Sequence, residues 1–208
     1  METANKVAQI SAMWNEILEK SKSIAIVGGR GSGKTAFGFF CSQFTKLPIY
    51  LFKYPSKDVL PENYNILYDF EEMVKIKDSF IWIDEPQLFI PIYEKKSNFE
   101  FMKLLSLMRQ KDNILVTSTS DTRFYTRGLE SYIDTWVVKD IDYDTIKQGS
   151  KISKIIKGNV VIHPEGFKLE KNEYLLDDRN FKKHCGKKTF ELPSFWNERI
   201  SKVFKEMV

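Results

Sequence analysis

The stretch SIAIVGGRGSGKT, residues 23–35, decides the fold of this chain. Its first five residues are an apolar run, which is typical of a buried parallel strand. The next eight fit the pattern GxxxxGK(S/T), in which glycines let the backbone curl until successive N–H groups point at a phosphate. A helix that begins near Lys34 would add the partial positive charge of its amino end. We therefore predict a strand, a phosphate-binding loop and a helix, in that order.

The side chains of this loop suit a nucleoside triphosphate bound with magnesium. Lys34 is expected to reach the β- and γ-phosphates, and the hydroxyl of Thr35 is expected to bind Mg²⁺. The sequence contains no NKxD-type motif for reading guanine, so ATP is the favoured nucleotide. The residues expected to bind it are Gly28, Gly29, Arg30, Gly31, Ser32, Gly33, Lys34 and Thr35.

A pair of adjacent carboxylates follows another strongly apolar run, Ser79–Ile83. Asp84, at the end of that expected strand, is predicted to bind Mg²⁺ through its water shell. Glu85, one residue further on, is predicted to act as the general base that activates the attacking water. Together with the phosphate-binding loop, this pair predicts an enzyme that hydrolyses ATP to ADP and phosphate.

The chain up to residue 144 alternates short apolar runs with amphipathic segments, which predicts a parallel sheet covered by helices on both faces. The expected strands are 23–27, 48–54, 66–68, 79–83, 114–118 and 135–139, and the expected helices are 4–20, 34–45, 69–77, 98–111 and 121–132. Residues 1–144 are thus predicted to form an α/β ATPase core. Residues 145–208 are predicted to be a basic C-terminal extension packed on it, containing a basic helix or arm (145–156), a hairpin (159–163 with 173–176) and an amphipathic helix (193–207).

Composition and charge are those of a globular protein with an uneven charge distribution. The 208 residues are 42% hydrophobic and carry a net charge of +4. Segment 145–190 alone has 11 Lys or Arg and 5 Asp or Glu, so it either attracts phosphate backbones or is simply a solvated lysine-rich surface. The two distant cysteines, Cys41 and Cys185, argue against a metal site or a disulfide framework and fit a reducing cytoplasm. No apolar run approaches the roughly 20 residues of a membrane span, and no secretory signal is evident.

The adjacent Asp84 and Glu85 resemble the acidic pair of the additional-strand catalytic-glutamate division of P-loop ATPases. The block from Phe80 to Arg123 is similar to the HerA/FtsK superfamily, especially to small viral genome-packaging ATPases. The resemblance spans about residues 22–140. It implies a RecA-like, three-layer α/β/α P-loop NTPase with an extra strand between the P-loop strand and the acidic strand, for which Ile114–Ser118 is the candidate.

The resemblance also implies a polar sensor of the γ-phosphate at the tip of the extra strand. Thr119 is the first choice, with Ser118 and Ser120 as alternatives, although the family typically has Gln at that place. A further implication is an arginine that acts across a subunit interface. Arg109 fits that role, and Arg123 and Arg127 are its rivals.

An arginine supplied in trans would mean a homo-oligomeric ring, expected to have five or six subunits. Such a ring would be an ATP-driven motor that moves or packages double-stranded DNA, in a host cytoplasm or in a virion, and a capsid or assembly protein would be a possible partner. Segment 147–157 is a candidate DNA-facing or subunit-facing element. The alternative is an ATPase directed at a protein, in assembly or secretion. A small-molecule kinase is less favoured, because such enzymes usually need an arginine-rich lid, and arginine is sparse here.

Overall fold

The computed structural model describes residues 2–90, 95–125, 127–141, 150–159, 168–197 and 199–200. Within these ranges, an eight-stranded sheet has the order β3-β2-β4-β5-β1-β6-β7-β8. The pairs from β3 to β6 are parallel, and β7 and β8 are antiparallel to their neighbours. The strands are β1 Ser23–Val27, β2 Ile49–Phe52, β3 Tyr64–Leu67, β4 Phe80–Asp84, β5 Ile114–Thr119, β6 Thr135–Val138, β7 Glu173–Asp178 and β8 Gly186–Thr189.

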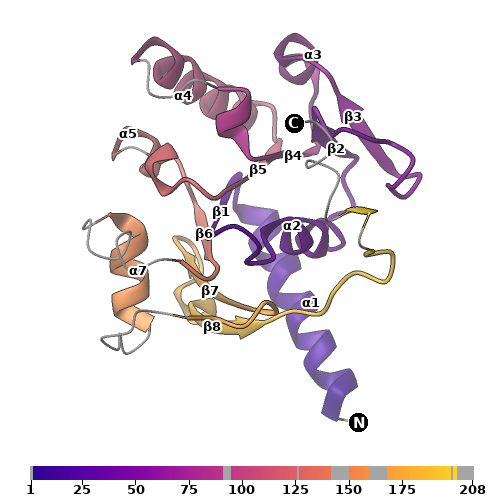
Figure 1. The fold of residues 1–208 in the computed structure, drawn as a ribbon, viewed down its shortest axis with the longest axis vertical. Coiled ribbons are helices and arrows are strands. Elements are labelled where there is room, and N and C mark those ends of the chain that lie inside the picture. Colours follow the sequence, from indigo (N-terminus) through magenta and orange to yellow (C-terminus); the bar gives the residue numbers. More distant parts are fainter. Residues whose placement is uncertain are drawn as a thin grey trace.

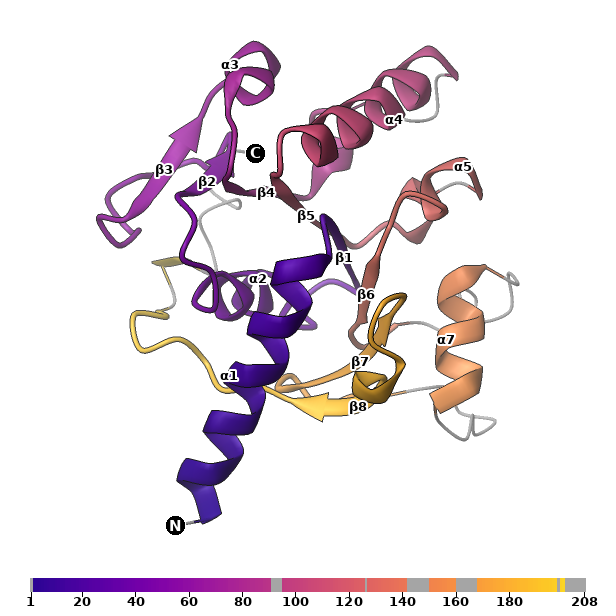
Figure 2. The same ribbon diagram turned by 180° about the vertical axis from the view of Figure 1, so that it is seen from behind.

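Helices cover both faces of this sheet and make three layers (Figures 1 and 2). Side chains of α1 and α2 belong to one apolar cluster, and side chains of α3, α4, α5 and α7 belong to the other. The α-helices are α1 Glu2–Lys20, α2 Lys34–Ser42, α3 Phe70–Lys75, α4 Lys95–Gln110, α5 Arg127–Glu130 and α7 Lys151–Asn159. Short 3-10 helices are η1 Pro86–Leu88, η2 Thr122–Phe124 and η3 Lys182–His184. The predicted three-layer α/β fold is confirmed. None of the described helices is long and apolar enough to cross a membrane.

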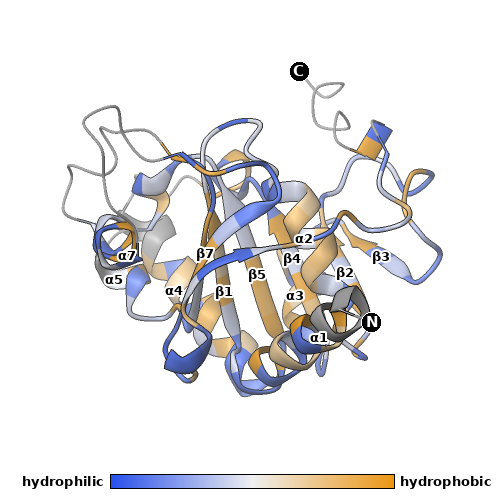
Figure 3. Ribbon diagram, turned by 90° about the horizontal axis from the view of Figure 1, so that it is seen from below, coloured by the Kyte–Doolittle hydropathy of each residue, from blue (hydrophilic) through white to orange (hydrophobic). Residues whose placement is uncertain are grey.

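The central strands are apolar on both faces because both faces are covered. In β1, Ile24 and Ile26 belong to the cluster under α1 and α2, whereas Ala25 and Val27 belong to the cluster under α4. Figure 3 shows the apolar colouring of β4 and β5 between the flanking helices. This burial accounts for the near-continuous apolar runs that identify these strands in the sequence.

The position of β5 confirms the expected additional strand. It pairs in parallel with β1 on one side and with β4 on the other, so it separates the P-loop strand from the acidic strand. Parallel strands end at the same edge of a sheet. The residues that follow β1, β4 and β5 therefore meet at one edge, and that edge forms the candidate site.

The predicted helix 121–132 is wrong. Asp121 caps only the 3-10 helix η2, through a 3.0 Å bond from the Arg123 amide, and a separate four-residue helix, α5, follows. The predicted helix 34–45 ends earlier, at Ser42. Apolar periodicity indicated both helices, but it does not fix where a helix breaks.

The predicted hairpin between 159–163 and 173–176 is also wrong in its pairing. Strand β7 pairs with β6 and with β8, and it thereby extends the main sheet. Asn159 ends α7, and residues 160–163 lie outside the described part. Of the predicted basic arm 145–156, residues 151–156 are in α7. The predicted helix 193–207 lies mostly outside the described residues, and its first part, 193–197, is not helical. The expected boundary between 144 and 145 falls in the undescribed stretch 142–149.

Candidate nucleotide site

The P-loop joins β1 to α2 in the conformation that its glycines allow. Gly31 and Gly33 have φ angles of 75° and 89°, in the left-handed region that favours glycine. Arg30 lies exposed at the tip of the loop, whereas Ser32 is buried. The Ser32 hydroxyl oxygen is the buried side-chain polar atom without a hydrogen-bond partner among the described residues. A buried hydroxyl without a partner is costly, and a phosphate oxygen would satisfy it. The loop therefore fits a phosphate ligand.

Lys34 lies at the mouth of this loop, and its side chain is almost fully buried. Its Nζ donates a hydrogen bond of 3.1 Å to the Gly29 carbonyl and lies 3.4 Å from Oε1 of Glu85. The P-loop lysine at the start of α2 and the predicted base just after β4 therefore lie side by side. This is the arrangement expected from the sequence.

Thr35 and Asp84 are joined directly. The Thr35 hydroxyl donates a 2.8 Å hydrogen bond to Oδ2 of Asp84, and the Ser118 hydroxyl donates a short one to Oδ1. Burial raises the pKa of Asp84 to about 6; the hydrogen bond from Ser118 opposes this, and the charge of Glu85 adds to it. An adjacent cation would offset the cost of burying this carboxylate. A hydroxyl and a carboxylate are hard oxygen donors, so the pair fits Mg²⁺.

Glu85 has an unusual backbone conformation, and a set of hydrogen bonds holds its carboxylate. Its φ of 49° lies in the left-handed region, which is uncommon outside glycine. Its Oε2 accepts hydrogen bonds from the Ser120 amide at 3.1 Å and the Ser120 hydroxyl at 3.2 Å. The Gln87 side-chain amide donates a further, short one. These contacts fix the carboxylate at the mouth of the loop, where its side chain keeps 23% of its surface exposed and can meet water.

The three polar residues at the tip of β5 have three different partners. Ser118 contacts Asp84, and Ser120 contacts Glu85. Thr119, the first choice for a sensor, donates a 2.7 Å hydrogen bond to Oε1 of Gln87, and its carbonyl accepts from the Gly28 amide at 3.3 Å. Gln87 thus links Thr119 to Glu85. Sequence reasoning missed Gln87, although a polar side chain two residues after the expected base was the available signal.

Lys139, directly after β6, was also missed. Its side chain is fully buried beside the P-loop, and its Nζ donates hydrogen bonds to the carbonyls of Lys171 at 2.7 Å and Glu173 at 2.5 Å. The next residue, Asp140, accepts a 2.6 Å hydrogen bond from the Gly29 amide through its carbonyl. The available signal was a pair of charged residues at the tip of a strand otherwise composed of apolar residues.

The structure does not bring Arg109 to the nucleotide site of its own chain. Arg109 lies in the last turn of α4 and forms a 2.8 Å ion pair with Asp134, which precedes β6 and therefore lies at the opposite, amino edge of the sheet. Arg123 follows the tip of β5, is largely exposed and pairs with Asp121 at 2.9 Å. The side chain of Arg127 lies outside the described residues. A role for any of these arginines in a neighbouring subunit stays a prediction.

No model of a protein family matches the chain, and no curated protein sequence matches it. Solved structures match it by fold. The DNA-packaging ATPase B204 from Sulfolobus turreted icosahedral virus superposes with a TM-score of 0.58 at 15% identity, over 83% of this chain and 98% of that one. B204 from Sulfolobus turreted icosahedral virus 2, in complex with ATP-gammaS, gives 0.55 at 14% identity over the same shares, 83% and 98%. EssC (ATPases 2 and 3) from Geobacillus thermodenitrificans gives 0.53 at 12% identity, over 91% of this chain and 42% of that one. At these low identities the matches show the fold, which this chain shares with B204 and with EssC.

Proposed function

We propose that this chain binds ATP with Mg²⁺ and hydrolyses it to ADP and phosphate. One observation carries the proposal: the ends of β1, β4 and β5 bring Lys34, Asp84 and Glu85 to the mouth of one glycine loop. The unpartnered Ser32 hydroxyl supports a phosphate ligand in that loop. The fold shared with a DNA-packaging ATPase and with a type VII secretion ATPase agrees with it.

Each residue has a role that follows from its position. The loop amides and Lys34 bind the phosphates, while Thr35 and Asp84 would hold Mg²⁺, which neutralises phosphate charge when it is bound. Glu85 accepts the proton of a water molecule as the water oxygen forms a bond to the γ-phosphorus. The bond between that phosphorus and the ADP oxygen breaks, and ADP leaves with the electron pair. Gln87 and Ser120 keep the Glu85 carboxylate in place during this step.

We further propose that the energy of hydrolysis moves double-stranded DNA, as in genome packaging by a virus or mobile element. Two observations support this: the basic C-terminal region and the likeness over 98% of the length of a viral DNA-packaging ATPase. The working form would be a homo-oligomeric ring in the host cytoplasm or the virion. An arginine from the neighbouring subunit would complete each site, and a capsid or assembly protein would dock the ring.

The test is the ATPase rate measured against added double-stranded DNA at low and moderate salt. We expect DNA to raise turnover, and we expect salt to weaken the effect because phosphate contacts are salt-dependent. The Glu85→Gln variant is the control for contaminating activity. If the protein were monomeric and its turnover did not change with added DNA, the translocase would be ruled out. The proposal that the chain hydrolyses ATP would still stand.

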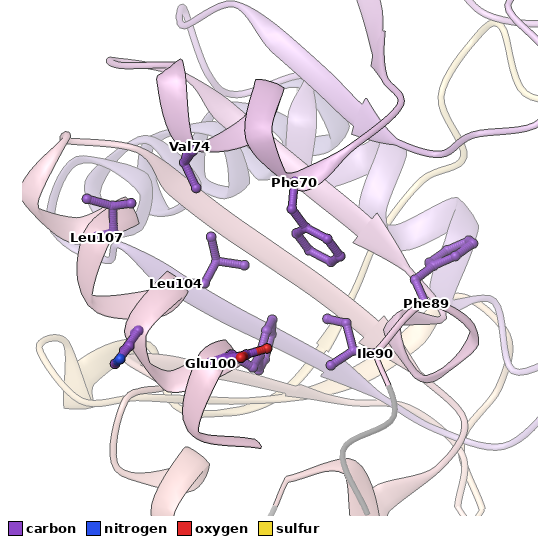
Figure 4. Close-up of a pocket in the computed structure, with 9 residues that line it drawn as sticks. Phe70, Val74, Phe89, Ile90, Glu100, Leu104 and Leu107 are labelled. Atoms are coloured by element: carbon purple, nitrogen blue, oxygen red, sulfur yellow. The ribbon is translucent and has the colours of Figure 1, made fainter. Parts of the chain in front are cut away.

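An ATPase directed at a protein is the second candidate, and a surface groove favours it. The groove lies between α3 and α4, has a volume of about 370 Å³, and is distinct from the phosphate loop (Figure 4). Its apolar lining includes Phe70, Val74, Phe89, Ile90, Leu104 and Leu107. The likeness to the cytoplasmic domain of the type VII secretion ATPase EccC from Thermomonospora curvata, with a TM-score of 0.53, agrees with this candidate. Substituting Leu107→Glu, at a half-buried position on the groove, would abolish stimulation by a protein partner but leave stimulation by DNA intact.

A further inference from the structure

A second lysine, Lys139, lies next to the P-loop. The side chain of Lys139 is fully buried, and its two acceptors are backbone carbonyls, those of Lys171 and Glu173. None of the ion pairs formed by the described residues involves Lys139. Burial of an amine that no ion pair stabilises disfavours its charged form.

The amine lies against the loop itself. A Cβ atom added to Gly28 would lie 2.6 Å from Cβ of Lys139, and one added to Gly33 would lie 3.9 Å from its Nζ. Gly33 directly precedes α2, so the amine is beside the amino end of that helix. The unpaired N–H groups there carry partial positive charge, which disfavours an ammonium group until an anion is present.

The charged groups around Lys139 offset only part of the penalty that burial places on its ammonium form. Glu173, at the start of β7, already pairs with Lys187 at 2.7 Å. Asp140 faces the amine from the end of β6, and Phe190, just after β8, places its ring 4.5 Å from Nζ. From α2, Lys34 adds a positive charge at the loop. Burial lowers the pKa of Lys139 to about 7, and the charges of Glu173 and Asp140 oppose the shift.

We propose that Lys139 is a second, phosphate-responsive lysine of the site, which takes up a proton from solvent when nucleotide phosphates enter the P-loop. The inference rests on the proposed function. Phosphates would bring several negative charges to the end of α2, and those charges favour the ammonium form of a buried amine nearby. The proton moves from solvent to Nζ, and no covalent bond between heavy atoms forms or breaks. The ammonium group donates more strongly to the two carbonyls, which ties residues 171–173 to the loaded loop.

The test is calorimetric titration of the whole chain with Mg²⁺ and AMPPCP, a nucleotide that is not hydrolysed. At pH 8 the phosphates are fully ionised, because the second pKa of a phosphate group is about 6. Running the titration in two buffers of different ionisation enthalpy counts the protons exchanged. We expect an uptake of roughly half to one proton per nucleotide, and an affinity that falls up to about tenfold per pH unit above pH 7. Binding without proton uptake would overturn the inference.

Two substitutions assign the proton to this residue. Lys139→Met has no titrating group, and Lys139→Arg keeps a guanidinium that does not lose its proton. We expect neither variant to take up the proton. Either of them, if it folds, is therefore sufficient to test the assignment. Lys46→Met, which removes an exposed lysine between α2 and β2, should behave as the wild type. Uptake that persists without Lys139 would refute its role. If the wild type bound no nucleotide at all, the proposed function would be rejected instead. The titration shows this outcome as an absence of binding heat in either buffer, so it differs from binding without proton uptake.

Discussion

The ammonium group of Lys34 lies 3.4 Å from Oε1 of Glu85. The lysine expected to bind phosphate and the carboxylate expected to act as base are therefore paired with each other. A bound γ-phosphate would compete with Glu85 for Lys34, because both are anions. Binding would therefore loosen this ion pair and leave Oε1 available to a water molecule. We therefore expect the base to be freer to accept a proton when the loop is loaded.

Replacing the base should separate binding from hydrolysis. In Glu85→Gln we expect ATP to bind with at least wild-type affinity, because the neutral amide no longer competes for Lys34. Turnover should fall by roughly a hundredfold or more, the scale of losing a positioned general base. Calorimetry with Mg-ATP and a steady-state phosphate assay measure the two effects. Glu62→Gln, at an exposed position, is the matched control. Wild-type turnover in Glu85→Gln would contradict the assignment.

Gln87 should matter for turnover and not for binding. Its amide joins Glu85 to Thr119, and within the described part of the chain it forms no hydrogen bond with the P-loop. In Gln87→Leu the carboxylate loses a charge-assisted hydrogen bond worth about 1.5–3 kcal/mol, so we expect kcat to fall by about tenfold or more with little change in KM. Gln110→Leu, at an exposed position in α4, should leave both unchanged. An equal loss in KM would instead point to a general disturbance of the site.

The sequence predicts those parts of the site whose chemistry is local. Gly28–Thr35 must be contiguous because successive amides wrap one phosphate, and Asp84 and Glu85 are adjacent at one strand end. The contacts of Lys139 were out of reach because they join residues 32 and 34 positions apart. Strand β7 was placed in the wrong pairing for the same reason, since an apolar run does not specify its neighbour. The place of β5 was predictable only through the family resemblance, because the sheet order is not encoded locally.

Gly38 should be the glycine least tolerant of a side chain. A Cβ atom there would lie 2.3 Å from the ring of Trp82, so α2 would have to move away from β4. We expect Gly38→Ala to lower the free energy of unfolding by about 1–3 kcal/mol or more, the cost of overpacking a core. Gly158→Ala in α7 is the control, because nothing lies within 4 Å of its added Cβ and alanine favours a helix by about 1 kcal/mol. Urea denaturation of both variants measures the contrast.

Arg109 and Arg123 should have separable effects. Arg109 holds Asp134, which is 8% exposed, so Arg109→Ala should cost about 1 kcal/mol of stability, a value kept small because the arginine is half exposed. Arg123 lies at the edge that carries the site, so Arg123→Ala should lower turnover of the assembled protein with little loss of stability. Melting curves and DNA-stimulated ATPase rates measure the two. Loss of turnover with unchanged stability in Arg109→Ala would restore it as the arginine acting in trans.

The buried amine of Lys139 should give the ligand-free protein a characteristic dependence of stability on pH. Its pKa is about 7 in the folded state against 10.5 for an ordinary lysine. Between these values the unfolded chain binds a proton that the folded protein does not, so the free energy of unfolding rises with pH, by up to about 1.4 kcal/mol per unit. Below about pH 7 both states hold the proton and the contribution is flat.

Lys139→Met removes the group, so its stability should climb less steeply than that of the wild type between pH 7 and pH 9. Urea denaturation at several pH values gives the two slopes, with Lys46→Met as the control that should follow the wild type. Parallel slopes for Lys139→Met and the wild type would show that the amine stays charged in the folded protein, held by its two carbonyl acceptors.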